Sequence, residues 1–369
     1  MKVSYFETGR YASLRPVPPD WPAAPAAYDR EAGAEAYRGM IERVECAEAL
    51  GFDWVSVSEH HYSPRILTPA PIVSAAFIAA RVHRIKIALL GPIIPQSNPV
   101  RVAEELAMLD TLSQGRLVAG LLRGTSNESL TYDLNPTESR ERTDEGMELV
   151  LRAWTEPQPF GWQGRHFRYR TVSIWPRPLQ QPHPPIVLPA DSDEGLDLAA
   201  RRRVGTGVAY RSTARARAVF DRYRALAARH GWTPVPEDCH VLRHVYVAES
   251  NARAREEAEP HLDYFWQKLL SYHRGSMKLL GMAPPAPPAT VRVTEDLPLY
   301  ALDFDLTQRH GLTFVGDPDH VVRAIRAHMR ELGAGTFMGL FQFGSLPHAL
   351  ACRNIELFAE RVLPRLRSA

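Results

Sequence analysis

Residues 84–124 read RIKIALLGPIIPQSNPVRVAEELAMLDTLSQGRLVAGLLRG, and this stretch contains a complete strand–helix–strand unit. Its first part, RIKIALLGPII (84–94), is a short apolar run of the kind that forms a buried strand. Asn98 before Pro99 marks a helix start, with asparagine as the N-cap and proline at the first helical position. The helix ends near Ser113, and RLVAGLLRG (116–124) predicts the next strand.

The same alternation continues along the whole chain. Further strands are predicted in the ranges 2–6, 54–59, 184–190, 204–210, 239–249 and 335–344, and helices occupy most of the intervals between strands. Eight strands separated by helices predict an α/β fold, a (β/α)₈ barrel formed as a single domain over residues 1–369. A doubly wound sheet is the alternative, but the first turn lacks the GxGxxG loop that holds a dinucleotide.

Two insertions account for the surplus length of the chain. The first, roughly 157–182, contains FGWQGRHFRYRTVSIWPRP (160–178), whose alternating aromatic segments around a Gln-Gly turn predict a β-hairpin. The second, roughly 260–312, contains the proline-rich GMAPPAPPAT (281–290), which predicts irregular structure. The stretch 281–300 is a candidate cover for the barrel mouth.

Composition narrows the functional class. The chain is 45% hydrophobic with a formal net charge of +2, and it has no block of like charges, so a nucleic-acid-binding surface is not expected. The three cysteines, Cys46, Cys239 and Cys352, lack the spacing of a zinc site or a disulfide framework. No leader-like or membrane-spanning apolar run is present, so we expect a cytoplasmic protein.

The segment SEHHY (58–62) directly follows a predicted strand, at the barrel end where active sites form. Strand alternation places Val55 and Val57 under the outer helices and turns the other face inward; that face carries Trp54, Ser56, Ser58 and His60. His60, not His61, should therefore face the mouth. A structural histidine is the competing interpretation. Adjacent histidines point to opposite faces, which disfavours a joint metal site.

Two other strand ends are candidate anion sites. Arg123 emerges at the end of the fourth strand and can clamp a phosphate or carboxylate, although a surface ion pair is the alternative. PADSDEGLDLAA (189–200) leads from a strand into a helix whose first turn offers Ser192 and free backbone N–H groups. Simple capping by Asp191 or Ser192 is the other interpretation of this second site.

Taken together, several motifs resemble those of the bacterial-luciferase-like flavin monooxygenases, over nearly the whole chain. They are SEHHY, the block IPQSNPVRVAEELAMLDTLSQGRL, the Arg-Gly pair at 123–124, the tryptophan-bearing hairpin and the ending NIELFAERVLPRL (354–366). The resemblance implies a (β/α)₈ barrel that uses reduced FMN, supplied by a separate flavin reductase, to activate O₂ as a flavin hydroperoxide. It also implies a homodimer acting on a small organic substrate.

The resemblance assigns roles to individual residues. It makes His60 the catalytic residue beside the reactive edge of the flavin, and it assigns to the cofactor Glu59, Leu90, Gly91, Asn98, Arg123, Asp191 and Ser192. It also predicts a non-proline cis bond between Leu90 and Gly91. The luciferases carry a cysteine where this chain has Leu122, so light emission is not expected.

The substrate pocket is expected beyond the fourth strand, with Asn127 and Tyr132 as contacts. Trp266, Tyr272 and His273 of the second insertion are further candidates, although aromatic residues there more often serve packing. The substrate and the kind of oxygen insertion stay open.

Three alternatives also stay open. The first is a deazaflavin-dependent oxidoreductase of the same fold. The second is a barrel hydrolase with a metal held by Glu59, His60 and His61. The third is a flavin-binding protein without turnover.

Overall fold

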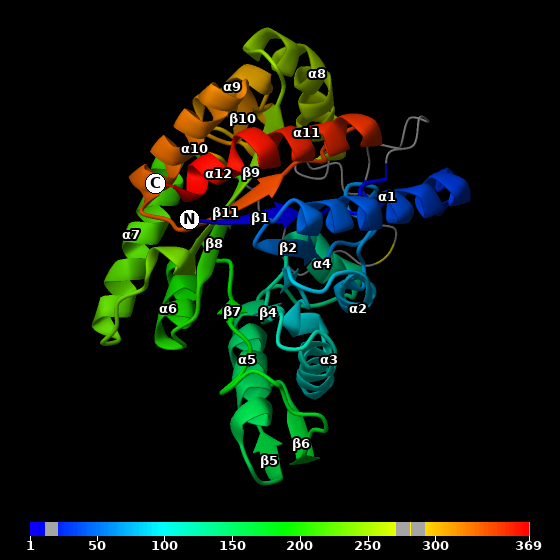
Figure 1. Ribbon diagram of the computed structural model, residues 1–369. Coiled ribbons are helices and arrows are strands. Elements are labelled where there is room, and N and C mark those ends of the chain that lie inside the picture. Colours follow the sequence, from blue (N-terminus) through cyan, green and yellow to red (C-terminus); the bar gives the residue numbers. More distant parts are fainter. Residues whose placement is uncertain (12–20, 271–280, 282–291, 369) are drawn as a thin grey trace.

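The structure is a computed structural model that describes residues 1–11, 21–270, 281 and 292–368 (Figure 1). Its parallel strands pair in a ring in the order β1, β2, β3, β4, β7, β8, β9 and β11, and β11 pairs with β1 again. The β7–β8 link is a single bridge between Val187 and Gly205. The bounds are β1 Lys2–Phe6, β2 Trp54–Ser58, β3 Lys86–Leu90, β4 Leu117–Gly120, β7 Ile186–Val187, β8 Thr206–Ala209, β9 Cys239–Val247 and β11 Thr336–Leu340. The predicted eight-stranded α/β architecture is confirmed.

Helices surround the ring (Figure 1). Their bounds are α1 Arg30–Ala49, α2 Pro71–Arg81, α3 Pro99–Leu112, α4 Ser126–Thr131, α5 Ser139–Thr155, α6 Asp193–Arg201, α7 Thr213–Arg229, α8 Asn251–Tyr264, α9 Phe304–Arg309, α10 Pro318–Leu332, α11 His348–Arg361 and α12 Leu363–Arg367. Short 3₁₀ segments are η1 Pro25–Ala27, η2 Ile94–Gln96, η3 Pro236–Asp238 and η6 Leu299–Ala301, and η4 Phe265–Leu269 is a π-helix. No helix in these ranges is long and apolar enough to cross a membrane.

Each strand separates two cores, as its alternation predicts. Val55 and Val57 belong to the large cluster between the strands and the outer helices. Trp54 and Leu90 belong to a smaller cluster inside the ring, together with Met338 of β11. The predicted inward face of β2 is therefore confirmed, and His60 follows that face out of the strand.

The first insertion forms the predicted antiparallel hairpin, β5 Phe160–Gln163 with β6 Arg168–Val172. It extends beyond the end of α5 (Figure 1). Tyr169 on β6 donates a hydrogen bond from its hydroxyl to Asn98 Oδ1 at 2.9 Å, which fixes the hairpin to the start of α3.

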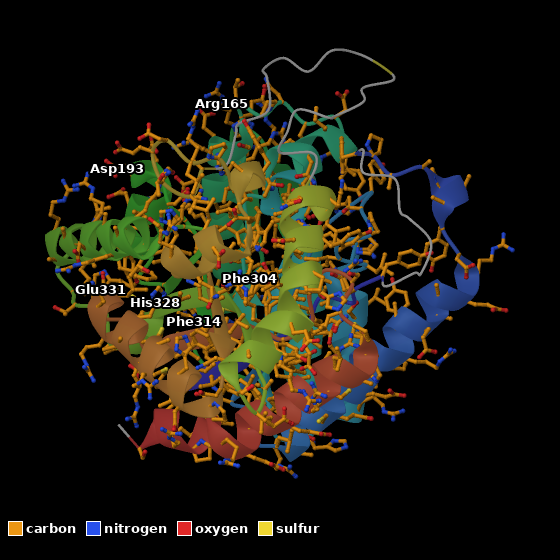
Figure 2. The ribbon with its side chains drawn as sticks, turned by 90° about the horizontal axis from the view of Figure 1, so that it is seen from above. Arg165, Asp193, Phe304, Phe314, His328 and Glu331 are labelled. Atoms are coloured by element: carbon orange, nitrogen blue, oxygen red, sulfur yellow. The ribbon has the colours of Figure 1, made fainter. Side chains whose placement is uncertain are left out.

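A strand that the sequence pattern did not predict directly follows the second insertion. β10, Thr313–Gly316, pairs in parallel with the C-terminal half of β9. Phe314 of β10 packs against His328 of α10, with ring centroids 5.3 Å apart, as the view from above shows (Figure 2). Residues 282–291, which include most of the predicted irregular stretch 281–290 and half of the candidate cover 281–300, lie outside the described residues.

Candidate active site

His60 lies immediately after β2, at the carboxyl end of the ring. Its Nδ1 is 2.9 Å from Glu128 Oε1 and also 2.9 Å from Arg65 Nη2. Its Nε2 has no hydrogen-bond partner among the residues that the structure describes. One ring nitrogen is thus held by the protein, and the other is left for a ligand.

Glu128 reaches His60 because of the way α4 begins after β4. The N–H of Thr125 donates to Glu128 Oε2 at 3.2 Å, and the Asn127 amide donates to Glu128 Oε1 at 2.8 Å. The carboxylate is buried and held on both oxygens. Neither Glu128 nor Arg65 was predicted from the sequence as a site residue, although the spacing Thr125-x-x-Glu128 is a capping-box signature.

The surroundings shift the pKa values of this pair. Burial and the nearby Arg65 guanidinium lower the pKa of His60, and Glu128 opposes them in part. Burial acts to raise the pKa of Glu128, but His60 and Arg65 outweigh it and the value falls. At neutral pH the group is therefore a neutral imidazole beside an ionised carboxylate.

A neutral His60 has two tautomers, and its two partners favour different ones. Arg65 can only donate, so it favours a bare Nδ1 with the proton on Nε2. Glu128 can only accept, so it favours the proton on Nδ1 and a bare Nε2. The free Nε2 can thus donate or accept a proton, as a relay residue requires.

Glu59 and His61, the neighbours of His60, hold the loop that follows β3. Glu59 Oε2 accepts from the Ile93 N–H at 3.0 Å, and Oε1 accepts from Gln96 Nε2 at 2.6 Å. His61 Nε2 lies 3.0 Å from the same Oε1 and is buried. These contacts explain why three ionisable residues follow a buried strand: one faces the mouth and two fix the adjacent loop.

The prediction of a cis bond between Leu90 and Gly91 is wrong. The cis bond lies one position later, between Gly91 and Pro92. Leu90 faces the inside of the ring, and Gly91 is buried against Glu59. A Cβ at Gly91 would stand 2.8 Å from Pro71 Cγ, so this backbone approaches its neighbours more closely than a side chain permits.

Arg123 lies after β4 and its side chain has no hydrogen bond or ion pair to any described residue. Burial and then Arg140 lower its pKa. Asp191 pairs with Arg211, and Arg140 pairs with Glu194 on α6. Three arginines therefore face two carboxylates here, which leaves one positive charge in excess.

Ser192 caps α6, because its hydroxyl accepts from the Gly195 N–H at 3.3 Å. Asp193 at the first position of that helix points outward and pairs with Arg222 at 3.0 Å (Figure 2). The capping interpretation thus holds for Ser192, whereas Asp191 forms the ion pair described above. An excess cation beside a helix start is a suitable place for an anion.

The remaining candidates have structural contacts. Asn98 caps α3, since Oδ1 accepts from Val100 N at 3.0 Å and Arg101 N at 3.2 Å. Asn127 is buried, and its amide is used on Glu128. Tyr132 is about half exposed, and its ring packs edge-on against His61 with centroids 5.2 Å apart.

A metal-dependent hydrolase would need a cluster of ligands. Among the residues in the described ranges, no group of three or more His, Cys, Asp or Glu side chains is placed to hold a metal ion. His60 and His61 point to different partners, as their positions on the strand end require. Tyr272 and His273, two of the candidate pocket residues, lie outside the described residues.

Comparison with known families decides the class of the protein. The family model described as luciferase-like monooxygenase matches residues 21–336. The chain belongs to this family. Relatives of this luciferase-like chain include an uncharacterised protein of Sinorhizobium fredii, 29% identical over 86% of this chain and 89% of that protein. The oxygenase component of a flavin-dependent trigonelline monooxygenase from Acinetobacter baylyi is 24% identical over 62% of this chain and 64% of its own.

Several solved structures share the fold of this luciferase-like chain. The monooxygenase RslO1 from Streptomyces bottropensis is 27% identical with a TM-score of 0.78, covering 100% of both chains. The oxygenating constituent of 3,6-diketocamphane monooxygenase from Pseudomonas putida, solved with FMN, has a TM-score of 0.77 at 18% identity, covering 99% of this chain and 98% of its own. An F420-dependent secondary alcohol dehydrogenase also shares the fold, with a TM-score of 0.73 at 15% identity and 99% of each chain covered.

Proposed function

We propose that this chain is the oxygenase component of a two-component FMN-dependent monooxygenase. It takes reduced FMN from a separate reductase and uses O₂ to oxygenate a small organic substrate. The observation that carries the proposal is His60, held at Nδ1 by Glu128 and Arg65, with Nε2 directed to no described residue. The trigonelline enzyme component is a relative with the same overall role.

The residues present fit reduced FMN. Arg123, together with the start of α6 at Ser192, supplies the excess positive charge that the phosphate needs. Close to this end, Gly120 allows tight packing, because a Cβ there would stand 2.5 Å from Leu89 O. Leu90, Gly91 and the loop fixed by Glu59 form the wall on which the ring would lie. Reduced flavin supplies the electrons for O₂ activation.

The protein side chains then have separate tasks. Arg123 and Ser192 bind the phosphate, and Leu90 and Gly91 orient the ring. Burial of the inner face excludes water. His60 Nε2 accepts or donates the proton that the reaction moves, while burial and Arg65 keep the imidazole neutral at neutral pH and Glu128 holds Nδ1. Asn127 acts by holding Glu128, and Tyr132 stays a candidate substrate contact.

A rapid-mixing experiment tests this function. The reduced FMN complex of the wild type, mixed with O₂, should give a transient absorbance distinct from both reduced and oxidised FMN. His60→Gln should change the lifetime of that species tenfold or more, whereas Arg165→Gln on the exposed hairpin turn should not. Direct reoxidation without a transient species in the wild type would count against an oxygenase.

A deazaflavin-dependent oxidoreductase of the same fold is the alternative function. Titration of reduced F420 into the same protein preparation tests it. Binding of reduced F420 in preference to reduced FMN would assign the chain to hydride transfer. We favour FMN because His60, Arg65 and Glu128 form a proton-transfer group at the flavin end of the barrel.

We further propose a homodimer formed by α2 and α3. Val73 and Phe77 lie one turn apart on α2 and are 66% and 56% exposed; Met108 and Leu112 lie one turn apart on α3 and are 54% and 63% exposed. The two helices pack side by side. An apolar face of this kind is typical of an interface.

The dimer is tested by light scattering after size exclusion. The wild type should have the mass of two chains, and Phe77→Glu with Leu112→Glu should have the mass of one. Val235→Glu, at an exposed position on another surface, is the control. A monomeric wild type would contradict the dimer.

A further inference from the structure

Three neighbouring strands of the ring end in buried polar atoms without a hydrogen-bond partner in the described chain. These atoms are Thr8 Oγ1 after β1, Ser58 Oγ at the end of β2 and Gln342 Oε1 after β11. β11, β1 and β2 pair consecutively. Their registers, Phe6 with Ser56 and Tyr5 with Gly339, continue to place Thr8 level with both Ser58 and Gln342.

The next strand of the ring, β9, adds the most unusual member. His244 is paired in register with Leu340, the last residue of β11. Its side chain is 1% exposed, and neither ring nitrogen has a partner among the described residues. The indole N–H of Trp266, fully buried beside it, has none either. We call these five residues the polar arc.

Buried polar atoms are nearly always paired within a folded protein, because an unpaired one loses its hydration without compensation. Five such residues at one end of one barrel are therefore unusual. Sites that bind a ligand keep such groups, since the ligand supplies the missing partners. The polar arc has the composition of a recognition surface.

Aromatic side chains surround His244 of the arc. The ring of His244 has centroid distances of 4.8 Å to Phe265, 5.2 Å to Trp266, 5.5 Å to Phe343 and 6.2 Å to Tyr210. Phe265 and Trp266 belong to the π-helix η4, a form found often at functional sites. These rings pack around His244, so a ligand reaches its ring nitrogens only if η4 shifts.

Tyr210 connects the arc with the His60 group. Burial raises its pKa, and the charge of Arg65, which contacts His60, opposes that shift. Tyr210 also has a φ of 56°, in the left-handed region that a bulky side chain rarely adopts. Strain of this kind is concentrated at functional sites.

Ionised groups near the arc already have protein partners. Glu7, one residue before Thr8, pairs with Arg43 at 2.9 Å. Arg10 donates to backbone carbonyls, including Pro64 O at 3.0 Å. Arg243, beside His244, donates to His328 Nε2 at 3.2 Å on α10, outside the ring (Figure 2). Burial lowers the pKa of His244 to about 3, so its imidazole is neutral.

We infer that the polar arc is the substrate-recognition surface of the proposed monooxygenase, and that its substrate is an uncharged, planar aromatic compound carrying hydroxyl and carbonyl groups. Trp266 can only donate and Gln342 Oε1 can only accept, whereas His244, Thr8 and Ser58 can do both. Glu7, Arg10 and Arg243, the ionised groups next to the arc in sequence, are already engaged by the protein, which disfavours a charged ligand. A flat ring suits the surrounding aromatic walls. The inference rests on the proposed function, and it names the substrate class.

Calorimetric titration of the full chain without flavin tests the inference. The probes are 6-hydroxy-1-tetralone, an uncharged aromatic with both oxygen functions, 2-naphthoate, a charged aromatic, and decanal, an aliphatic aldehyde. The tetralone should bind most tightly. His244→Phe and Trp266→Phe should each weaken it tenfold or more, and Trp175→Phe, at an 88% exposed position, should not.

Tighter binding of 2-naphthoate or decanal, no binding of the tetralone, or equal affinity in His244→Phe would overturn the inference. FMN titration of the same variants separates the two proposals. Retained FMN affinity in His244→Phe supports a substrate surface, whereas loss of FMN affinity assigns the arc to the flavin instead. If the wild type binds the tetralone but does not bind FMN, the arc is still a binding surface and the proposed oxygenase function is wrong.

Thermal unfolding of the variants gives a second readout. Because His244→Phe removes two unpaired buried nitrogens and keeps an aromatic ring, it should raise the Tm, by about 2 °C or more. A substantially lower Tm would show that His244 is a structural residue.

Discussion

At the scale of single residues, the central feature is a histidine nitrogen shared by two partners of opposite kind. Arg65 and Glu128 both approach Nδ1 of His60 at 2.9 Å. An arginine lowers the pKa of a neighbouring imidazole, and a carboxylate raises it. The protein thereby sets the proton affinity of Nε2 without touching that atom.

This balance predicts opposite effects for two substitutions. Arg65→Met should raise the pKa of His60, because the repelling charge is removed, and Glu128→Gln should lower it, because the attracting charge is removed. Titration of the histidine Cε1–H resonances by NMR measures both shifts, with His60→Gln to assign the signal. Shifts in the same direction would contradict the arrangement, and Arg165→Gln should shift nothing.

The position of His60 after the inward face of β2 could be predicted from the sequence, because strand alternation is local. Trp54, Ser56 and Ser58 alternate inward, and His60 follows them. Glu128 lies 68 residues further along the chain. The contact between Glu128 and His60 depends on the strand order of the ring, in which β2 and β4 lie on either side of β3. A local sequence pattern does not contain this strand order.

At the scale of elements, two helix starts resemble each other in sequence but differ in surroundings. Asn98 and Ser192 both cap a helix. Asn98 is exposed and its oxygen is used by α3 and by Tyr169 of the hairpin. Ser192 lies at the helix whose first turn is lined by arginine–carboxylate pairs near Arg123.

Alanine substitutions should separate these two starts. Asn98→Ala should lower the free energy of unfolding by about 1 kcal/mol through loss of the cap, without changing FMN affinity. Ser192→Ala should lower stability to a similar degree and also weaken FMN several-fold. Urea unfolding and flavin titration measure the two effects. A tenfold loss of FMN affinity in Asn98→Ala would show that Asn98 is a cofactor residue, as the resemblance implies.

Elements with long apolar runs or clear caps were predicted from sequence. β3, α3 and β4 were all found in the stretch 84–124. β10 was missed because its four residues, TFVG, are too short to be recognised alone and are fixed by pairing with β9. The cis bond was misplaced by one position, since only the folded loop shows which bond is cis.

At the scale of the whole molecule, buried neutral histidines make stability depend on pH. Burial lowers the pKa of His240 and His244 to about 3 and that of His328 to about 2. The unfolded chain binds protons at these histidines near pH 6.5, and the folded chain does not. The contribution of these three histidines to the free energy of unfolding should therefore be constant above pH 7. It should decrease as the pH falls below 6.5.

The loss of unfolding free energy between pH 7 and pH 5 is of the order of 2 kcal/mol per histidine. Urea unfolding at the two pH values measures it. His244→Phe should show a smaller loss than the wild type, because one of the three groups is gone. Exposed His83→Gln should behave as the wild type does. An equal loss in all three proteins would contradict the assignment of His244 as buried and neutral.

The most direct test of the account is an anaerobic titration of oxidised and reduced FMN into the wild type and Arg123→Ala, followed by absorbance and fluorescence. Reduced FMN should bind at micromolar concentration or tighter, oxidised FMN should bind more weakly, and Arg123→Ala should weaken binding of reduced FMN tenfold or more. Arg165→Ala should bind as the wild type does. If neither form of FMN binds to the wild type, the proposed cofactor and the roles given to Arg123, Ser192 and His60 are wrong.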